Sequence, residues 1–266
     1  KFVIRTADDA CHCWVCGIKG KTLAPIIKKF LNSQSLLDEY IRVFNDGKLL
    51  SVETSLIDEK LRIPFDFKLL AHTKSSIDPD YRAGINYIKS RGLIDDDLWS
   101  LKVGMTVSER SLQRRVILPS FDASGELNYY VGRAIDSNVK PKYLNANVNK
   151  RSIVFNEISI DWTKVLTIVE GPFDLAKCDL NTTCVLGSGL SDDSLLFARI
   201  VQNKTPVVLA LDADMQHKQQ KIAKKLTEFD IDVKILDLGV HHDVGEMTKK
   251  EFLLAKKNAS QWNRDA

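Results

Sequence analysis

Short apolar runs alternate with amphipathic segments through the last third of the chain, and this alternation constrains the fold most strongly. The apolar runs have the length and composition of buried strands, and they occur at Val165–Val169, Thr183–Leu186, Val207–Leu211 and Val233–Leu236. The amphipathic segments predict helices over Pro172–Leu180, Ser191–Gln202, Met215–Phe229 and Val244–Asn258. Because neighbouring parallel strands need crossover helices, the pattern predicts an α/β unit with a parallel sheet flanked by helices.

Acidic residues stand where these expected strands end. Glu170 follows the first run and Asp174 opens the next helix, Asp212 and Asp214 follow the third run, and Asp243 comes after the fourth. The carboxyl ends of parallel strands meet at one edge of a sheet, so we expect these side chains to cluster. The helix macrodipole alone could account for any one acid at a helix start. It does not account for Asp212, whose place directly after a buried strand requires a metal or hydrogen bonds. The group is therefore expected to bind Mg²⁺ or Mn²⁺ and to be catalytic.

Basic residues concentrate just before this unit. Between Gln113 and Arg151 there are seven basic residues and three acidic ones, a net +4, whereas the whole chain carries only +3. Within that segment, Arg115–Phe121 and Leu127–Arg133 read as two strands around a turn. A basic platform beside an acidic edge is the balance expected of an enzyme that holds a phosphate backbone and divalent metals. The structural alternative is a solvated surface hairpin, which is common for scattered Lys and Arg.

The acidic motifs resemble a known signature. Glu170-Gly-Pro-Phe-Asp174, followed by Asp212-Ala-Asp214 after an apolar strand, is similar to the TOPRIM motif of bacterial-type primases, type IA and II topoisomerases and some nucleases. The resemblance implies that Glu170, Asp212 and Asp214 hold the metal while Asp174 and Asp243 assist. One departure stands out. Bacterial primases carry a further acid two residues after the one matching Asp243, and this chain has Gly245 there, followed by Glu246.

The basic segment resembles a narrower family. Residues 113–155 are similar to the conserved core of bacterial and T-even phage DNA primases, through Arg115-Val-Ile-Leu-Pro-Ser-Phe, Gly132-Arg133, Pro141-Lys142-Tyr143-Leu-Asn145 and Lys150. The resemblance implies that the residues contacting template and nucleotide phosphates are Arg133, Lys142 and Lys150, with Tyr143 and Asn145 in the same loop. We add Arg114 and Arg115 to the expected nucleic-acid or nucleotide contacts.

The two resemblances together imply a primase, a DNA-directed RNA polymerase that synthesises short RNA primers on single-stranded DNA by metal-dependent nucleotidyl transfer. The implied partners are the template, ribonucleoside triphosphates, the RNA primer, a separate replicative helicase and a single-strand-binding protein. Two alternatives remain open at this stage. One is another TOPRIM phosphotransfer enzyme, a nuclease or topoisomerase, and the other is a catalytically silent DNA-binding adaptor of the replisome.

A cysteine cluster lies near the start of the chain. Cys13-Trp-Val-Cys16 has the spacing of one zinc knuckle, which needs a second pair of ligands to complete a tetrahedron. Cys11 or His12 could contribute a ligand, and buried free cysteines are the alternative. Primases of the resembled family begin with a zinc-binding domain, so we expect structural zinc here and a first knuckle upstream of Lys1. Cys178 and Cys184 sit in apolar segments and are expected in the core.

These observations predict an order of segments along the chain: the C-terminal part of a zinc-ribbon domain with following helices (1–44), a linker (45–77), a mixed α+β basic subdomain of the polymerase core (78–162), the TOPRIM subdomain (163–258) and a tail (259–266). A helix is expected to start at Asp78-Pro79 and to run to Lys89. No apolar run approaches the length of a membrane span, so we expect a cytoplasmic protein, in the host cytoplasm if it is phage-encoded.

Overall fold

The computed structural model describes residues 2–4, 11–13, 19–20, 22–24, 27, 33, 35–43, 61–187 and 189–263. The chain divides into two compact units, Lys1–Ile57 and Asp58–Ala266. The first unit contains an antiparallel sheet of β1 (Phe2–Ile4), β2 (Cys11–Cys13) and β3 (Lys19–Gly20), and residues 35–43 are helical. Leu37 and Cys11 are buried within it. None of the helices in the described part of the chain is long and apolar enough to cross a membrane.

The second unit begins with an antiparallel sheet, in the order β4-β5-β6-β7-β8. Its strands are β4 (Lys68–Leu69), β5 (Gly104–Met105), β6 (Arg115–Phe121), β7 (Leu127–Ala134) and β8 (Tyr143–Asn145). The pairing of β6 with β7 confirms the hairpin expected in the basic segment, with Arg115 opposite Ala134. Its tip is closed by Asp122, whose carboxylate accepts hydrogen bonds from the Ser124 and Glu126 backbone.

Part of the expected linker belongs to this sheet. Residues 68–69 form β4, which pairs with β5, and they continue into the 3-10 helix η2 (Leu70–His72). Leu70 is completely buried, so this segment contributes to the core. The linker expectation is therefore wrong for residues 68–72, because a two-residue strand is too short to give a periodic pattern. Residues 45–60 lie outside the described part.

Two helices accompany the antiparallel sheet, α3 (Pro79–Ser90) and α4 (Asp95–Ser100). The carboxylate of Asp78 accepts a hydrogen bond from the Asp80 amide at 2.8 Å, so Asp78 caps α3 as expected. Tyr81, Ile85 and Ile88 are buried on one face of α3. The helix ends at Ser90, just before Arg91.

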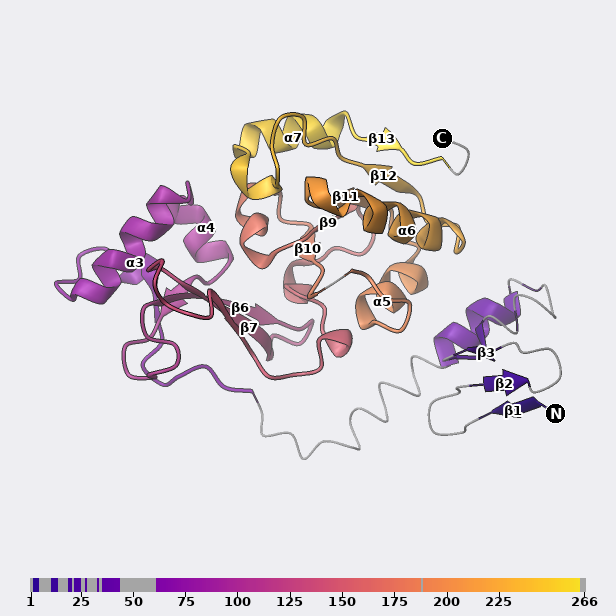
Figure 1. Ribbon diagram of the computed structural model, residues 1–266, viewed down its shortest axis with the longest axis horizontal. Coiled ribbons are helices and arrows are strands. Elements are labelled where there is room, and N and C mark those ends of the chain that lie inside the picture. Colours follow the sequence, from indigo (N-terminus) through magenta and orange to yellow (C-terminus); the bar gives the residue numbers. More distant parts are fainter. Residues whose placement is uncertain are drawn as a thin grey trace. The chain divides into compact units, whose positions relative to one another are not determined.

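The parallel sheet predicted from the alternating pattern is present (Figure 1). Its order is β10-β9-β11-β12-β13, with β9 (Leu166–Val169), β10 (Thr182–Cys184), β11 (Val207–Ala210) and β12 (Val233–Ile235) parallel and β13 (Ser260–Gln261) antiparallel at one edge. Residues of β9 and β11 are almost all inaccessible to solvent, as expected of strands covered on both faces. Cys178 and Cys184 are buried, which confirms their place in the core.

The segments between these strands differ in part from the expectation. Helices α5 (Leu195–Asn203) and α6 (Gln216–Thr227) are present, and η6 (Ala213–Met215) leads into α6. The segment expected to be helical over Pro172–Leu180 is instead the 3-10 helix η5 (Pro172–Lys177). The helix expected over Val244–Asn258 is divided into η7 (Val244–Glu246) and α7 (Lys249–Lys257). Thr248 causes this break, because its hydroxyl caps a new helix by accepting a hydrogen bond from the Glu251 amide. Two further 3-10 turns are η3 (Lys150–Ser152) and η4 (Glu157–Ser159).

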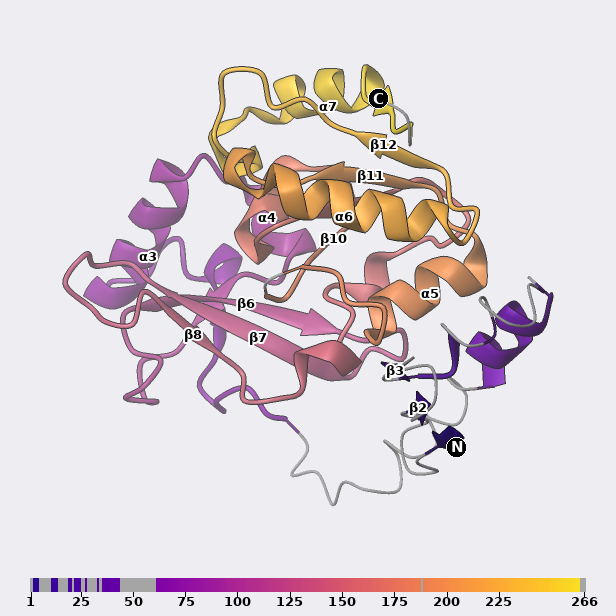
Figure 2. The ribbon, with the colours of Figure 1, turned by 45° about the vertical axis from the view of Figure 1, so that its right-hand side comes forward.

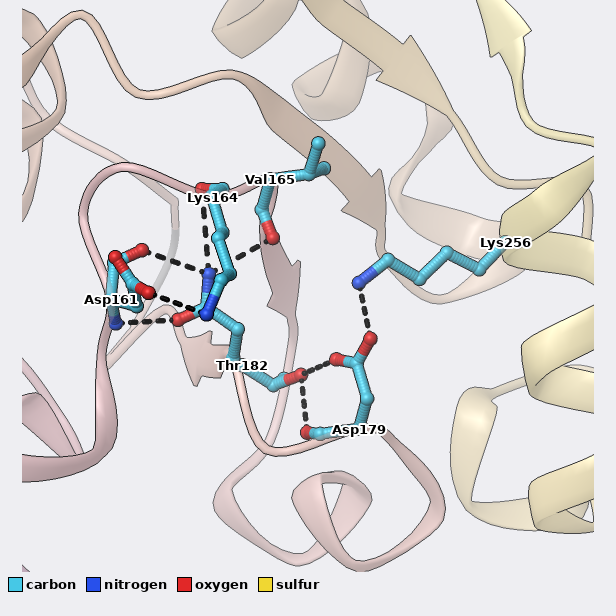
Figure 3. Close-up of polar contacts among 7 residues, drawn as sticks. Asp161, Lys164, Val165, Asp179, Thr182 and Lys256 are labelled. Atoms are coloured by element: carbon cyan, nitrogen blue, oxygen red, sulfur yellow. Dashed lines mark hydrogen bonds and ion pairs between the residues drawn. The ribbon is translucent and has the colours of Figure 1, made fainter.

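Polar contacts fix helix α7 and the start of β10 (Figure 3). The Lys256 ammonium contacts the Asp179 carboxylate at 2.5 Å, and the Thr182 hydroxyl donates to the carbonyl and the carboxylate of the same aspartate. The Lys164 ammonium contacts the Asp161 carboxylate at 2.7 Å. These contacts lie at the amino ends of β9 and β10, away from the ends that carry the acidic residues.

The two sheets share a hydrophobic core within the second unit, and Figures 1 and 2 both show them as neighbours. Val116, Leu118 and Tyr129 of the antiparallel sheet belong to the same buried cluster as residues of the parallel sheet such as Val169 and Val208. The Thr183 hydroxyl of β10 also donates to the carbonyl of Phe155 at 2.7 Å. The carboxyl ends of the parallel strands are therefore held in a fixed position beside β7 and β8.

Candidate functional site: an acidic edge and a basic wall

The acidic cluster is built by the register of two neighbouring strands. Val169 of β9 pairs with Ala210 of β11, so both strands reach the same edge, where Glu170 and Asp212 follow them. One carboxylate oxygen of each of Glu170, Asp212 and Asp214 lies within 4.8 Å of the others. In the order β10-β9-β11-β12, the connections from β9 and β11 run in opposite directions, and open α/β sheets bind ligands at such a switch point.

Backbone and side-chain contacts hold the turn after β11. The Leu211 amide donates to the buried side-chain oxygen of Gln219 in α6 at 3.2 Å. The Ala213 amide donates to the His242 carbonyl at 2.9 Å, which ties this turn to the loop that carries Asp243. Asp212 thus lies between two residues whose backbone amides are anchored.

Asp174 is fixed by its own helix start. Its carboxylate accepts a hydrogen bond from the Gly171 amide at 2.9 Å, at the start of η5. Burial raises the pKa of Asp174 to about 6, although the Gly171 hydrogen bond opposes the rise. Asp174 lines the same cavity as Glu170 and Asp212.

The electrostatics of the cluster favour a bound cation. Burial, followed by the nearby charge of Glu170, raises the pKa of Asp212 to about 7. Burial and the charge of Asp214 likewise raise the pKa of Glu170. Glu170 Oε2 and Asp212 Oδ1 are buried and have no hydrogen-bond partner. Two unsatisfied carboxylate oxygens beside a third carboxylate fit a hard divalent cation such as Mg²⁺ or Mn²⁺.

The departure at Gly245 leaves a narrow space. A Cβ atom on Gly245 would lie 2.8 Å from Asp174 Oδ1 and 3.1 Å from Asp243 Oδ1. The next residue does not supply the missing acid, because the Glu246 carboxylate accepts a hydrogen bond from the His242 amide at 2.9 Å. Asp243 accepts from the Glu246 amide and caps η7 while it lines the cavity. Asp174 and Asp243 therefore face each other across Gly245 with no third carboxylate from this loop.

A cavity of about 470 Å³ separates this edge from the antiparallel sheet. The sequence-predicted residues that line it are Arg133, Lys142, Tyr143, Asn145, Lys150, Glu170, Asp174, Asp212 and Asp243. Asp214 belongs to the acidic cluster but is exposed outside this lining. The residues expected in the basic segment and those expected in the acidic motifs thus line the same cavity.

Aromatic rings orient the basic side of the cavity. The Arg133 guanidinium lies 5.1 Å from the ring centre of Tyr143 and 5.6 Å from that of Phe173, and it donates a hydrogen bond to the Tyr143 hydroxyl. The Lys142 ammonium lies 5.7 Å from the Tyr143 ring. Arg133 Nε is buried without a hydrogen-bond partner. A guanidinium held between two rings is orientated for an anionic ligand before that ligand arrives.

Arg114 and Arg115 do not line the cavity, and their expected role in phosphate binding stays a prediction. Arg114 contacts Asp136 through two nitrogens, at 2.6 and 2.7 Å, and Asp80 at 2.8 Å. Arg115 is buried and donates to the carbonyls of Ser111 and Lys142. Arg114 joins α3 to the strand ends, and Arg115 supports the loop that carries Lys142. Sequence reasoning did not foresee these partners, because a basic residue in a basic segment does not reveal what it contacts.

Two cavity residues were missed by the sequence reasoning. Arg91, just after α3, lines the cavity, and its guanidinium is 3.5 Å from the position of a Cβ on Gly245. Phe173 contacts Arg133 and lies 6.4 Å, centre to centre, from the Tyr143 ring. Arg91 is far from both motifs in sequence, so no spacing could have assigned it. Phe173 could have been found, since it lies inside the Glu170–Asp174 motif.

The predicted zinc ligands lie in the first unit. Cys11 is buried and its thiol donates to the Thr22 carbonyl at 3.4 Å. The backbone of Cys13 pairs with Phe2 between β2 and β1. Cys16 and the side chains of His12 and Cys13 lie outside the described residues. The zinc site stays a prediction.

No family model matches this chain. A DNA primase of Clostridium acetobutylicum is 28% identical over 197 residues, which are 64% of this chain and 31% of that protein. The chain thus spans about a third of the length of this curated relative.

Solved structures match over more of the chain. The Aquifex aeolicus primase, comprising zinc-binding and RNA polymerase domains, covers 98% of this chain and 76% of its own, with a TM-score of 0.58 and 16% identity. This chain has the fold of the DNA primase core. The E. coli primase catalytic core covers 69% of this chain and 75% of its own at a TM-score of 0.55 and 15% identity. The match to a DnaG primase catalytic domain bound to single-stranded DNA covers 73% of this chain and 79% of that chain, with a TM-score of 0.56 and 15% identity. The resemblance to primases read from the motifs is thereby confirmed.

Proposed function

We propose that this chain is a primase, a DNA-directed RNA polymerase that joins ribonucleotides on a single-stranded DNA template during DNA replication. The observation that carries the proposal is the cavity in which a carboxylate cluster faces Arg133, Lys142 and Lys150. Nucleotidyl transfer needs both sides, because the reacting phosphates carry negative charge and the attacking hydroxyl must lose a proton. The primase relative of Clostridium acetobutylicum and the structures of primase cores support the same assignment.

The residues of the acidic edge are assigned to the metal. Glu170, Asp212 and Asp214 would hold a divalent ion, which, when bound, lowers the pKa of the primer 3′-hydroxyl and offsets charge on the leaving pyrophosphate. Asp174 and Asp243 line the same cavity and keep its electrostatic potential negative beside that cluster. This arrangement attracts cations to one wall and leaves the phosphates to the other.

The residues of the basic wall are assigned to the phosphates. Arg133, orientated by Tyr143 and Phe173, presents a planar donor set to a phosphate, and Lys142 and Lys150 add charge without reading a base. Arg91 reaches the space beside Gly245 and contributes positive charge there, between Asp174 and Asp243. Asn145 offers an amide that can position a nucleotide without selecting one base.

A division of labour with the first unit completes the proposal. Cys13 and Cys16 are assigned to a structural zinc site, completed by ligands upstream or by Cys11 or His12, and this unit selects the start site. A truncated chain beginning at Asp58, which retains β4, is expected to extend a preformed primer weakly but to lose selective initiation. Zinc analysis of the intact protein that finds no tightly held metal contradicts this assignment.

The proposed setting follows from the same function. The chain would act in the cytoplasm, which is the host cytoplasm if the protein is phage-encoded. A separate replicative helicase and a single-strand-binding protein are the proposed partners, together with ribonucleoside triphosphates and the growing RNA primer. Co-sedimentation of the chain with the helicase of the same replication system would test the first of these.

Incorporation of labelled ribonucleotides on a single-stranded template tests the proposed activity. RNA synthesis that depends on Mg²⁺ or Mn²⁺ and is absent in Asp212→Asn is the expected result. Metal-dependent cleavage of DNA without incorporation would instead identify a TOPRIM nuclease or topoisomerase. Template binding without either reaction would identify a DNA-binding adaptor.

A further inference from the structure

A second group of basic residues lies on α6, outside the cavity described above. Lys218, Lys221 and Lys225 are spaced three and four residues apart, so they lie along one face of the helix. They line a separate hollow of about 290 Å³ together with Gly189, Leu190, Ser191 and Ile222. Lys224, on the same helix and also exposed, is not among the residues that line it.

The hollow carries a net positive charge. Lys225 contacts Asp192 at 2.7 Å, and the neighbouring Asp193 contacts Arg151 at 2.6 Å. Lys221 has no ion pair among the described residues, whereas Lys218 contacts the Met215 sulfur at 3.3 Å and its charge acts on the nearby Glu170 carboxylate. The two acids of the β10–α5 connection are therefore engaged, and Lys221 is left for a ligand.

The hollow adjoins the catalytic cavity through one segment of chain. Val185, Leu186 and Gly187, after β10, line the catalytic cavity, whereas Gly189 to Ser191 of the same connection line the hollow. Lys218 lies close enough to Glu170 for its charge to oppose the rise in the pKa of that carboxyl. Figure 2 shows α6 and α5 on the same side of the sheet, with the connection into α5 beside α6. The basic face of α6 thus begins near the acidic cluster and leads away from it.

Gly187 lines the catalytic cavity and Gly189 lines the hollow. Gly187 and Gly189 have φ values of +142° and +140°, a backbone conformation that residues with a Cβ atom rarely adopt. A Cβ on Gly187 would meet no atom within 4 Å, and one on Gly189 would meet only Ile222 Cδ1 at 3.9 Å. These two glycines are required by the backbone conformation and leave room for an extended ligand to approach.

We propose that the hollow formed by Lys218, Lys221 and Lys225 binds the phosphate backbone of single-stranded DNA that extends beyond the catalytic cavity. None of its described lining residues is aromatic, so bases cannot stack there and the contact is with phosphates, without sequence preference. The inference rests on the proposed function for the identity of the ligand and adds a second contact surface to it. The surface lengthens the occluded site on the template.

Lys221→Gln tests this surface, and Lys224→Gln is the matched control, because both residues are exposed on α6 and both changes remove one charge. Binding of fluorescein-labelled oligothymidylates is followed by anisotropy over a range of salt concentrations, with one short oligomer and one long oligomer. For the long oligomer, Lys221→Gln is expected to lower the slope of log K against log salt by about 0.7, the value for one phosphate contact on a single strand. Binding of the short oligomer, and both slopes of Lys224→Gln, should match the unchanged protein.

Equal slopes for Lys221→Gln and Lys224→Gln would overturn the proposal, as would a loss that is the same for both oligomers. Ribonucleotide addition on a short template separates this inference from the proposed function. If the chain incorporates nucleotides but the two lysine variants bind the long oligomer alike, the surface is wrong and the function stands. If Lys221→Gln alone lowers the slope while the unchanged chain incorporates nothing, the surface stands and the proposed function is wrong.

Discussion

The acidic edge and the basic wall of the cavity differ in how their charges are balanced. On the acidic edge, Glu170 and Asp212 each keep a buried oxygen without a partner, and their pKa values are raised. On the basic wall, Arg133 Nε is likewise buried without a partner, but its guanidinium already contacts two rings and a hydroxyl group. A bound cation would therefore neutralise the acidic edge, whereas the guanidinium of the basic wall is orientated in advance. Binding of a divalent cation at the acidic edge should raise the free energy of unfolding much more than binding of a nucleotide at the basic wall.

Replacement of Asp212 should have the largest effect. Asp212→Asn keeps the size of the side chain and removes one ligand of a metal worth several kcal/mol, so we expect a loss of ribonucleotide incorporation of about a thousandfold. The stability of the metal-free protein at pH 8 should rise, because a desolvated charge is removed. Calorimetric titration with Mn²⁺ and thermal unfolding measure both. Primer synthesis at the normal rate would remove Asp212 from the catalytic residues.

The stability of the metal-free protein should also depend on pH, and the direction of this dependence can be stated. Burial raises the pKa of Asp212 to about 7 and that of Asp174 to about 6, whereas the pKa of an aspartate in an unfolded chain is about 3.9. The folded state thus binds more protons between these values, and the free energy of unfolding should fall as the pH rises from about 4 through about 7. Urea unfolding in EDTA measures this slope. Asp212→Asn should flatten it, and a slope unchanged by that replacement would show that Asp212 titrates normally.

Replacing Arg133 or Arg114 should separate a phosphate contact from a structural ion pair within the basic segment. Arg133→Ala should weaken single-stranded DNA or nucleotide binding and lower the salt slope by about 0.7, as expected for one phosphate contact. Arg114→Ala should leave that slope unchanged and lower the stability by about 1 kcal/mol, because its partners Asp136 and Asp80 are partly exposed. Anisotropy titrations and urea unfolding of both variants separate the roles. If both variants lose the same salt dependence, Arg114 also contacts phosphate.

The smallest effect is expected at Gly245. Its Cβ would lie 2.8 Å from Asp174 Oδ1, so Gly245→Ala should displace that carboxylate and reduce incorporation by a few-fold, roughly 1 kcal/mol in the barrier. The backbone of Gly245 does not have a positive φ, so folding should be unaffected. Steady-state incorporation and circular dichroism test both parts. An active variant with unchanged metal affinity would mean that Asp174 can move without consequence.

The sequence predicted the acidic edge better than the basic wall, and the reason is physical. A carboxylate that ends a buried strand has its position set by the sheet, so Glu170 and Asp212 could be placed from local pattern alone. An arginine has a long side chain and several possible partners, and its role depends on contacts that are distant in sequence. The contact of Arg114 with Asp80 could not be recognised in the sequence, and Arg91 was missed for the same reason.

The shortest elements of the fold could not be predicted from the sequence either. The four parallel strands were predicted because each is a run of apolar residues, and the expected hairpin was marked by its turn. Strand β4 has two residues and no periodicity, so it was taken for linker. The break at Thr248 was missed because a capping threonine inside an amphipathic segment looks like any polar residue.

The hydrogen bond from the Leu211 amide to Gln219 limits how the chain can change in length. Because Leu211 directly follows β11 and Gln219 is buried in α6, the number of residues from Asp212 to Lys218 must stay constant for this bond to form. One inserted residue there would rotate Gln219 out of reach and release the turn that carries Asp212. The hairpin tip at Asp122–Gly125 is held differently: it is largely exposed, and the Ala123 backbone donates a hydrogen bond to the Glu157 carboxylate of η4. Insertions should therefore be excluded between Asp212 and Gln219.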